Sequence, residues 1–98
     1  MNLDYEIIPS AFFLSQLDGL SIKSLRIVEE KILLLKKNPF RFKRIKGYSL
    51  FLFRIRFEDN RKEKRIIYLV DKSKVKILCI LDRDNNYKDL NFFIKKYI

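Results

Sequence analysis

The most constraining feature of this chain is a stretch of strict two-residue alternation between positions 50 and 58. The odd-numbered positions are apolar throughout, and the even-numbered positions change from leucine to charged residues halfway along. The first set is Phe51, Phe53, Ile55 and Phe57, and the second is Leu50, Leu52, Arg54, Arg56 and Glu58. This period predicts a half-buried strand with an aromatic core face and an opposite face that becomes basic. Asp59 and Asn60 supply turn residues, and a second apolar run follows from Arg65 to Val70, so we expect a long antiparallel hairpin.

The arginines of this hairpin are the first candidates for function. Arg65 shares its parity with Ile67 and Leu69 on the second strand. If the register places this parity beside Arg54 and Arg56, three guanidinium groups converge near the open end of the hairpin. They then border an apolar patch made of Leu50, Leu52, Ile67 and Leu69. A guanidinium cluster on a sheet surface needs anionic partners, because arginine stays protonated at any ordinary pH.

The segments before the hairpin predict one strand and two helices. Residues 3–8 alternate as a short strand that Pro9 ends, and Ser10 stands at the N-cap of a helix over residues 11–17. Ser21 caps a longer helix that Asn38 and Pro39 terminate. Its apolar stripe consists of Ile22, Leu25, Val28, Ile32 and Leu35. Both helices need an apolar surface to cover, so we expect them to pack on the aromatic face of the hairpin.

The segments after the hairpin predict another strand and a terminal helix. Val75 to Leu81 is a strong strand, and the apolar side of the helix carries Tyr87, Leu90, Ile94 and Tyr97. We expect this helix to cover the apolar half of the second sheet face, where a partner with a similar stripe can displace it. The chain therefore predicts an α+β two-layer sandwich, with a largely antiparallel sheet packed on two N-terminal helices and a C-terminal helix on or near the other face. With 98 residues, positions 1–98 form a single domain.

The net charge of +10 is concentrated in a quarter of the chain. Residues 1–40 carry five basic and five acidic side chains, residues 41–65 carry ten and three, and residues 66–98 carry seven and four, which gives 0, +7 and +3. This distribution indicates a polyanionic partner, nucleic acid before an acidic protein segment, although a solubilising surface explains the same charge. No apolar run approaches the roughly 18 residues of a membrane span and the N-terminus lacks a basic leader, so we expect a cytoplasmic protein with no membrane partner.

Basic residues alternate with apolar and aromatic ones in the connector, residues 40–48. Such a segment can follow a phosphate backbone and stack on bases. The plainer interpretation is a structural connector, in which Phe42 and Ile45 pack into the core and the basic residues are solvated. The structural role and the RNA-binding role are compatible. The candidate residues for binding RNA are Arg41, Lys43, Arg44, Lys46 and Lys64.

The residue types present disfavour most enzyme classes. The chain has no His, one Cys, no Gly-rich phosphate loop and no carboxylates clustered at metal-ligand spacing. We interpret Cys79 as a small buried apolar residue. Arginines can stabilise charge on a phosphate, and a tyrosine hydroxyl among cations is a conceivable base toward a ribose 2′-OH. RNA cleavage without a metal or other cofactor is therefore possible, whereas the same residues without the substrate geometry form a passive phosphate-binding patch.

Several short motifs occur in a characteristic order. They are Asn38-Pro39-Phe40, Lys46-Gly47, FRIRFED, KRIIYLVD, VKILCILDR and Asn86-Tyr87-Lys88-Asp89-Leu90. Together they resemble the RelE/ParE superfamily of small bacterial and archaeal toxins, over nearly the whole chain. The resemblance to the RelE branch implies a ribosome-dependent endoribonuclease that cuts mRNA in the ribosomal A site. It also implies a cognate acidic, RelB-like antitoxin that holds the toxin in check.

The same resemblance assigns roles to particular residues. It implies a catalytic set made of Arg54, Arg56, Arg65, Arg83 and Tyr87. The tyrosine would be the base or the activator of the 2′-OH, and the arginines would stabilise charge, one of them being a candidate donor to the leaving oxygen. Two departures from the family are expected: a longer hairpin turn, from Glu58 to Glu63, and Asp82 where a His or Arg often precedes the position of Arg83.

Two alternative functions use the same scaffold or charge. The ParE branch shares the fold, lacks the full catalytic set and inhibits DNA gyrase. A non-catalytic RNA-binding or ribosome-associated module needs the basic surface without the tyrosine. The presence of all five catalytic candidates favours the RelE-like branch.

Overall fold

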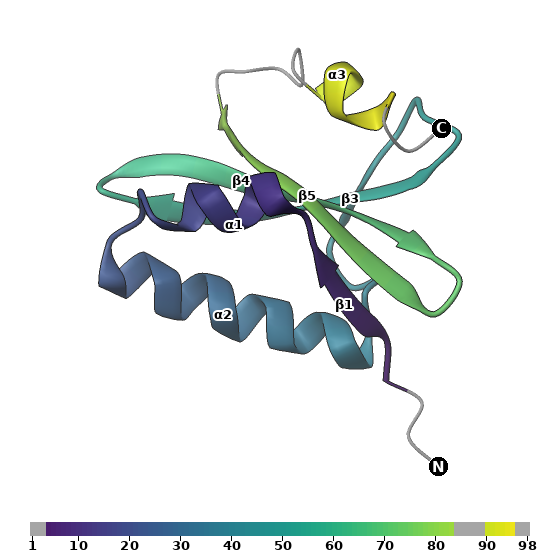
Figure 1. The fold of residues 1–98 in the computed structure, drawn as a ribbon, viewed down its shortest axis with the longest axis horizontal. Helices are drawn as coiled ribbons and strands as arrows, with labels where there is room; N and C mark the ends of the chain where they lie inside the picture. Colours follow the sequence, from purple (N-terminus) through teal and green to yellow (C-terminus); the bar gives the residue numbers. More distant parts are fainter. Residues whose placement is uncertain (1–3, 84–89, 96–98) are drawn as a thin grey trace.

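The computed structural model describes residues 4–83 and 90–95 of the chain. Its elements, in chain order, are β1 (Glu6–Pro9), α1 (Ala11–Leu17), α2 (Ile22–Lys37), β2 (Lys43–Ile45), β3 (Phe51–Asp59), β4 (Lys62–Asp71), β5 (Lys74–Asp82) and α3 (Leu90–Ile94). The strands form one sheet in the order β1-β5-β4-β3-β2, with β1 parallel to β5 and the other pairs antiparallel. Helices α1 and α2 lie on one side of this sheet and α3 lies on the other (Figure 1). The predicted α+β sandwich is confirmed.

Serine side chains begin both N-terminal helices, as the sequence predicts. The Ser10 hydroxyl accepts a hydrogen bond from the Phe13 backbone at 3.0 Å, and the Ser21 hydroxyl accepts one from the Ser24 backbone at 3.2 Å. The Ser10 hydroxyl also donates to the carbonyl oxygen of Leu78 on β5 at 2.6 Å. The first cap therefore fixes α1 to the sheet as well as starting the helix.

The apolar stripe of α2 begins later than predicted. Val28 and Leu35 are buried, but Ile22 is 74% exposed, so its assignment to the stripe is wrong. Ile22 and Val28 are six residues apart, and each residue of an α-helix turns the chain by about 100°. The six residues fall about 120° short of two full turns, so the two side chains point about 120° apart around the helix. Ser24, four residues before Val28, takes the buried position instead.

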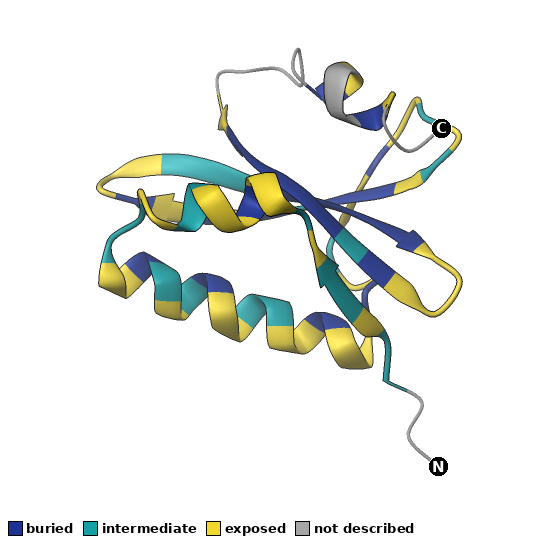
Figure 2. Cartoon of the chain, in the orientation of Figure 1, coloured by how far each residue is buried: buried dark blue, intermediate teal, exposed yellow. Residues whose placement is uncertain are grey.

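The sheet has an apolar core on each face (Figure 2). The helix-side core joins Phe53, Ile55, Phe57, Ile66, Tyr68, Val70, Val75, Ile77 and Ile80 to Phe13, Val28 and Leu35 of the helices. The second core contains Ile45, Leu52, Ile67, Leu69, Leu78, Cys79, Leu81, Leu90 and Ile94. The expected burial of Cys79 and the expected cover of the apolar patch by the C-terminal helix are confirmed, although Tyr87 and Tyr97 lie outside the described residues. Phe51 has the parity of the helix-side core but is 52% exposed, which corrects its assignment to that core.

The hairpin of β3 and β4 turns more tightly than predicted. Pairing runs from Phe51 opposite Val70 to Asp59 opposite Lys62. Asn60 and Arg61 form the turn with positive φ angles of 50° and 66°, which is the conformation of a two-residue type I′ turn. The expected longer turn is therefore wrong, because Glu58 and Glu63 are themselves paired across the strands.

The connector is held to β4 at its start and to α3 at its end. The Tyr68 hydroxyl, on β4, donates to the Pro39 carbonyl oxygen at 2.6 Å, and the Tyr48 hydroxyl donates to Asn91 Oδ1 of α3 at 3.1 Å. Phe42 packs against the helix-side core and Ile45 is buried in the second core, which confirms their predicted packing into the core. The middle of the connector forms β2 and lengthens the sheet beside β3.

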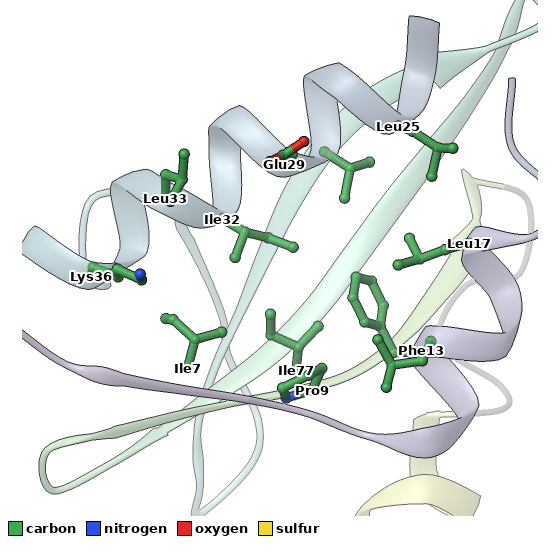
Figure 3. Close-up of a pocket in the computed structure, with 12 residues that line it drawn as sticks. Ile7, Pro9, Phe13, Leu17, Leu25, Glu29, Ile32, Leu33, Lys36 and Ile77 are labelled. Atoms are coloured by element: carbon green, nitrogen blue, oxygen red, sulfur yellow. The ribbon is translucent and has the colours of Figure 1, made fainter. Parts of the chain in front are cut away.

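An apolar groove lies between α1, α2 and the edge of β1 (Figure 3). Its cavity volume is about 530 Å³, and its lining includes Ile7, Phe13, Leu17 and Ile32. Leu33, on α2, borders the groove and is 53% exposed.

In the part of the chain that the structure describes, no helix has the length and apolar character needed to cross a membrane.

A buried carboxylate joins the start of α2 to the tip of the hairpin. Asp59 Oδ1 accepts hydrogen bonds from the Ser21 backbone at 3.2 Å and from the Ser21 hydroxyl at 3.1 Å. The Ser24 hydroxyl donates to the neighbouring Glu58 carbonyl oxygen at 3.1 Å. The neighbouring Ser24 side chain, followed by the hydrogen bond from the Ser21 backbone, lowers the pKa of Asp59 despite its burial. The folded state therefore favours the ionised form of this carboxyl group.

We expect Asp59 to make the stability of the fold depend on pH. Because its pKa is lower when folded, its stabilising effect is complete above the pKa of the unfolded chain, about 4, and is lost as the pH falls through the folded value. Asp59→Asn should lower the free energy of unfolding at neutral pH and flatten its decline below about pH 5. Urea denaturation across this pH range measures both effects. The exposed Asp18→Asn is the control, and parallel profiles for Asp59→Asn and the unaltered protein would contradict the assignment.

Candidate functional site

The hairpin register brings the predicted arginines onto one sheet surface. Arg56 pairs directly with Arg65, and Arg54 lies between Lys43 of β2 and Ile67 of β4. Directly paired residues point to the same side of a sheet, so these cations share the face opposite α1 and α2. We call this surface, defined by Lys43, Arg54, Arg56 and Arg65, the arginine face. The predicted placement of Arg54, Arg56 and Arg65 on one face of the sheet is confirmed.

The position of the arginine face differs from the prediction. The pair of Arg56 and Arg65 lies in the half of the hairpin next to the turn, three pairs from Asp59 and Lys62. The open end carries the apolar pair of Leu52 and Leu69, which belongs to the core that α3 covers. The expectation that the arginines converge near the open end is wrong, because Arg56 stands late in β3 and Arg65 stands early in β4, so their pair lies close to the turn. Arg56 remains exposed there, and the Arg65 side chain is only 12% exposed.

The arginine face lowers the stability of the hairpin. Like charges directly opposite each other on antiparallel strands are destabilising, by an amount in the range of about 0.2–1 kcal/mol that cross-strand pairs contribute. Arg56 and Arg65 form one such pair, and Glu58 and Glu63 form the next pair on the same face, two positions closer to the turn. An anion bound between the two arginines would remove this repulsion, because each guanidinium group can then donate to it.

Glu63 already supplies such an anion within the chain. Its Oε2 lies 3.7 Å from Nη2 of Arg65 and 3.7 Å from Nε of Arg83. This carboxylate therefore joins Arg83, which follows β5 and is 68% exposed, to the arginine face. The sequence analysis did not identify Glu63, although its two-residue spacing from Arg65 places both on the same strand face. In the free protein Glu63 occupies a position where a phosphate would compete for the same donors.

Several candidate binding residues do not join the arginine face. Lys64 pairs across the strands with Phe57 of the helix-side core, and its ammonium group lies 2.8 Å from Asp82. Arg44 pairs with Phe53 and also points to the helix side. Arg41 and Lys46 are exposed in the connector, outside β2. The connector therefore contributes Lys43 to the arginine face and distributes its other cations elsewhere.

The tyrosine predicted as the base, Tyr87, lies outside the described residues. Tyr68 is unsuitable as a base, since it is fully buried on the helix side, donates to Pro39 and has its pKa raised by burial. Tyr48 donates to Asn91 on the side of α3. Across residues 4–83 and 90–95, no group of three acidic, His or Cys side chains is arranged to hold a metal ion.

We expect Glu63 to compete with RNA for the arginine face. Glu63→Gln removes the negative charge with little change in shape, so affinity for a short single-stranded RNA should rise about 1.4- to fivefold, the equivalent of an exposed ion pair of about 0.2–1 kcal/mol. Fluorescence anisotropy at low salt measures this affinity. Glu30→Gln, on the exposed surface of α2, makes the same change in net charge and serves as the control. Equal gains for the two variants would show that only net charge matters.

Comparison with known proteins supports the fold. No protein-family model matches the chain, and no curated protein matches it. Among solved structures, the chain is similar to the Escherichia coli toxin RelE, in a mutant with two arginines replaced by alanine and in the free state. The TM-score is 0.74 at 14% sequence identity, and the match covers 97% of this chain and 98% of that chain. The chain therefore has a RelE-like fold over nearly its whole length.

Proposed function

We propose that this chain is the toxin of a toxin–antitoxin pair and an endoribonuclease that cleaves mRNA on the ribosome. The observation that carries the proposal is the arginine face, which a RelE-like fold presents on the side of the sheet away from α1 and α2. Arg54, Arg56 and Arg65 come from two adjacent strands, and Glu63 links Arg83 to them. The proposed place of action is the cytoplasm, where mRNA and ribosomes meet.

The proposed reaction is attack of a ribose 2′-oxygen on the adjacent phosphorus. The bond from phosphorus to the 5′-oxygen of the next nucleotide breaks, which leaves a cyclic phosphate and a free 5′-hydroxyl. Arg56 and Arg65 face each other and can donate from two sides to the phosphate oxygens as negative charge develops. Each well-placed donor of this kind contributes about 2.7–4 kcal/mol to the transition state. Tyr87 is the proposed base toward the 2′-OH, and Arg83 is the proposed donor to the departing oxygen.

The proposed dependence on the ribosome follows from the chemistry of these groups. The chain contains no His, and a tyrosine hydroxyl is a weak base near neutral pH. Catalysis then depends on a substrate already held with its 2′-oxygen in line with the scissile bond. The A site of a ribosome supplies a fixed mRNA backbone, while the same RNA in free solution samples many conformations.

Cleavage in a cell-free translation reaction tests the proposed function. The protein should produce discrete cuts in mRNA occupied by ribosomes and little cutting of the same RNA in solution. Arg65→Ala should slow cleavage of bound mRNA by about 10²–10³-fold, and Tyr87→Phe by about 10²–10⁴-fold. Arg26→Ala, an exposed arginine on α2, is the matched control and should leave cleavage unchanged.

The other outcomes of this experiment assign other functions. Arrested translation with intact mRNA would exclude nuclease chemistry. Inhibition of DNA gyrase in place of RNA cleavage would indicate a ParE-like toxin. Binding to ribosomes or RNA without either effect would make the arginine face a docking surface of a non-catalytic module.

We further propose that an acidic, RelB-like antitoxin binds both the basic surfaces and the apolar groove. An acidic amphipathic segment that folds as it binds would offer charge to residues 41–65, which carry +7, and an apolar stripe to the groove.

Co-purification with the acidic protein that an adjacent reading frame encodes tests this interface. Replacing Arg41, Lys43 and Arg44 by neutral residues should weaken the co-purification. Leu33→Glu, which places a charge in the groove, should weaken it as well, even with the basic residues intact. The control is Leu34→Glu, 41% exposed on the same helix but not part of the groove lining. Unchanged binding by both test variants would contradict the proposed interface.

A further inference from the structure

A second basic surface lies on the opposite side of β2 from the arginine face. Successive side chains on a strand point to opposite faces, so Lys43 faces the arginines and Arg44 faces the helix side. The guanidinium carbon of Arg44 lies 4.4 Å from the centre of the Phe51 ring. Phe51 is 52% exposed, since the helices do not cover this end of β3. The edge of the sheet therefore presents an arginine stacked on an open aromatic ring.

Phe40 adds a second ring of fixed orientation to this edge. It is 50% exposed, and it makes edge-to-face contacts with Tyr5 and Phe53 at centroid distances of 6.2 and 5.7 Å. Its neighbour Pro39 accepts the hydrogen bond from the buried Tyr68 hydroxyl. A ring that is already ordered loses little side-chain entropy when a ligand stacks on it. We call the surface formed by Phe40, Arg44 and Phe51 the edge platform.

A small polar pocket adjoins Phe51. Its cavity volume is about 200 Å³, and its wall includes Ser49, Asp71 and Lys76. The Asp71 carboxylate and the Lys76 ammonium group lie 3.6 Å apart. Because Lys76 pairs with Leu69 of the second core, whereas Phe51 pairs with Val70 of the helix-side core, this ion pair lies on the other sheet face from the Phe51 ring. The feature that the edge offers to a nucleobase is therefore the flat face of an exposed ring, not this ion pair.

We propose that the edge platform binds an unpaired nucleotide of single-stranded RNA, with its base on Phe51 and its phosphate at Arg44. The proposal takes RNA as the partner from the proposed function but does not depend on cleavage. An RNA strand crossing the edge of β2 contacts Lys43 on the arginine face and Arg44 on the platform. An acidic peptide would use the arginine but gives no account of the two exposed rings. Single-stranded RNA accounts for the rings and the charges together.

Binding of an uncleavable RNA tests the edge platform separately from the nuclease. The probe is a fluorescent 2′-O-methyl oligouridylate, compared by anisotropy with a duplex of the same length. Phe51→Leu keeps an apolar side chain but removes the aromatic face, so its dissociation constant for the single strand should rise roughly 5- to 100-fold, with little change for the duplex. Arg44→Gln should weaken binding and reduce the salt dependence by about 0.7, the contribution of one phosphate contact on a single strand.

Phe12→Leu provides the matched control, because Phe12 is 45% exposed on α1 and lies outside the edge platform. Circular dichroism of each variant checks that the fold is retained. Unchanged single-strand affinity for Phe51→Leu and Arg44→Gln would overturn the proposal. An equal loss of duplex binding would reduce the platform to a general polyanion surface, and an equal loss of polyglutamate binding would indicate an acidic peptide as its partner. Because the probe cannot be cleaved, failure of the nuclease proposal leaves this result unaffected.

Discussion

The pairing register of β3 with β4 is the constraint on which the rest of the structure depends. The two-residue turn at Asn60 and Arg61 fixes this register, and a slip by one residue would exchange the two faces of a strand. Such a slip would place Arg56 in the helix-side core and expose Phe57. The aromatic core, the arginine face and the cover of the apolar patch by α3 therefore follow from one hairpin geometry.

The hairpin divides stability and charge between its two faces. The helix side is stabilised by burial of aromatic and branched side chains and by the hydrogen bonds between Asp59 and Ser21. The opposite face carries the repulsive pair of Arg56 and Arg65, which the carboxylate of Glu63 partly neutralises. Charge repulsion on one side of a sheet is tolerable when the other side is well packed, and local destabilisation is typical of surfaces that bind a ligand.

Periodicity predicted most of the fold because its elements are strongly amphipathic. The alternation ending at Phe57, the serine caps and the hairpin were all readable from local patterns. Periodicity did not predict the exposure of Phe51, which depends on where the helices end over the sheet. Ile22 was assigned to the apolar stripe although helical geometry places it about 120° around α2 from Val28. Periodicity also missed the ion pairs of Glu63, because contacts between β4 and the residue after β5 require the assembled sheet. The roles assigned to the catalytic candidates remain predictions.

The proposed function requires that the arginine face binds an RNA phosphate. Nitrogen-15 NMR of the arginine side chains can detect this contact, with the Nε resonances assigned by single substitutions and an RNA made uncleavable by a 2′-deoxy nucleotide at the cut site. If the phosphate binds there, the signals of Arg54, Arg56 and Arg65 shift together and saturably as the RNA is added, and Arg83 follows as Glu63 is displaced. Unchanged signals for these arginines, at RNA concentrations that shift those of Arg41 and Arg44, would show that RNA does not bind the arginine face.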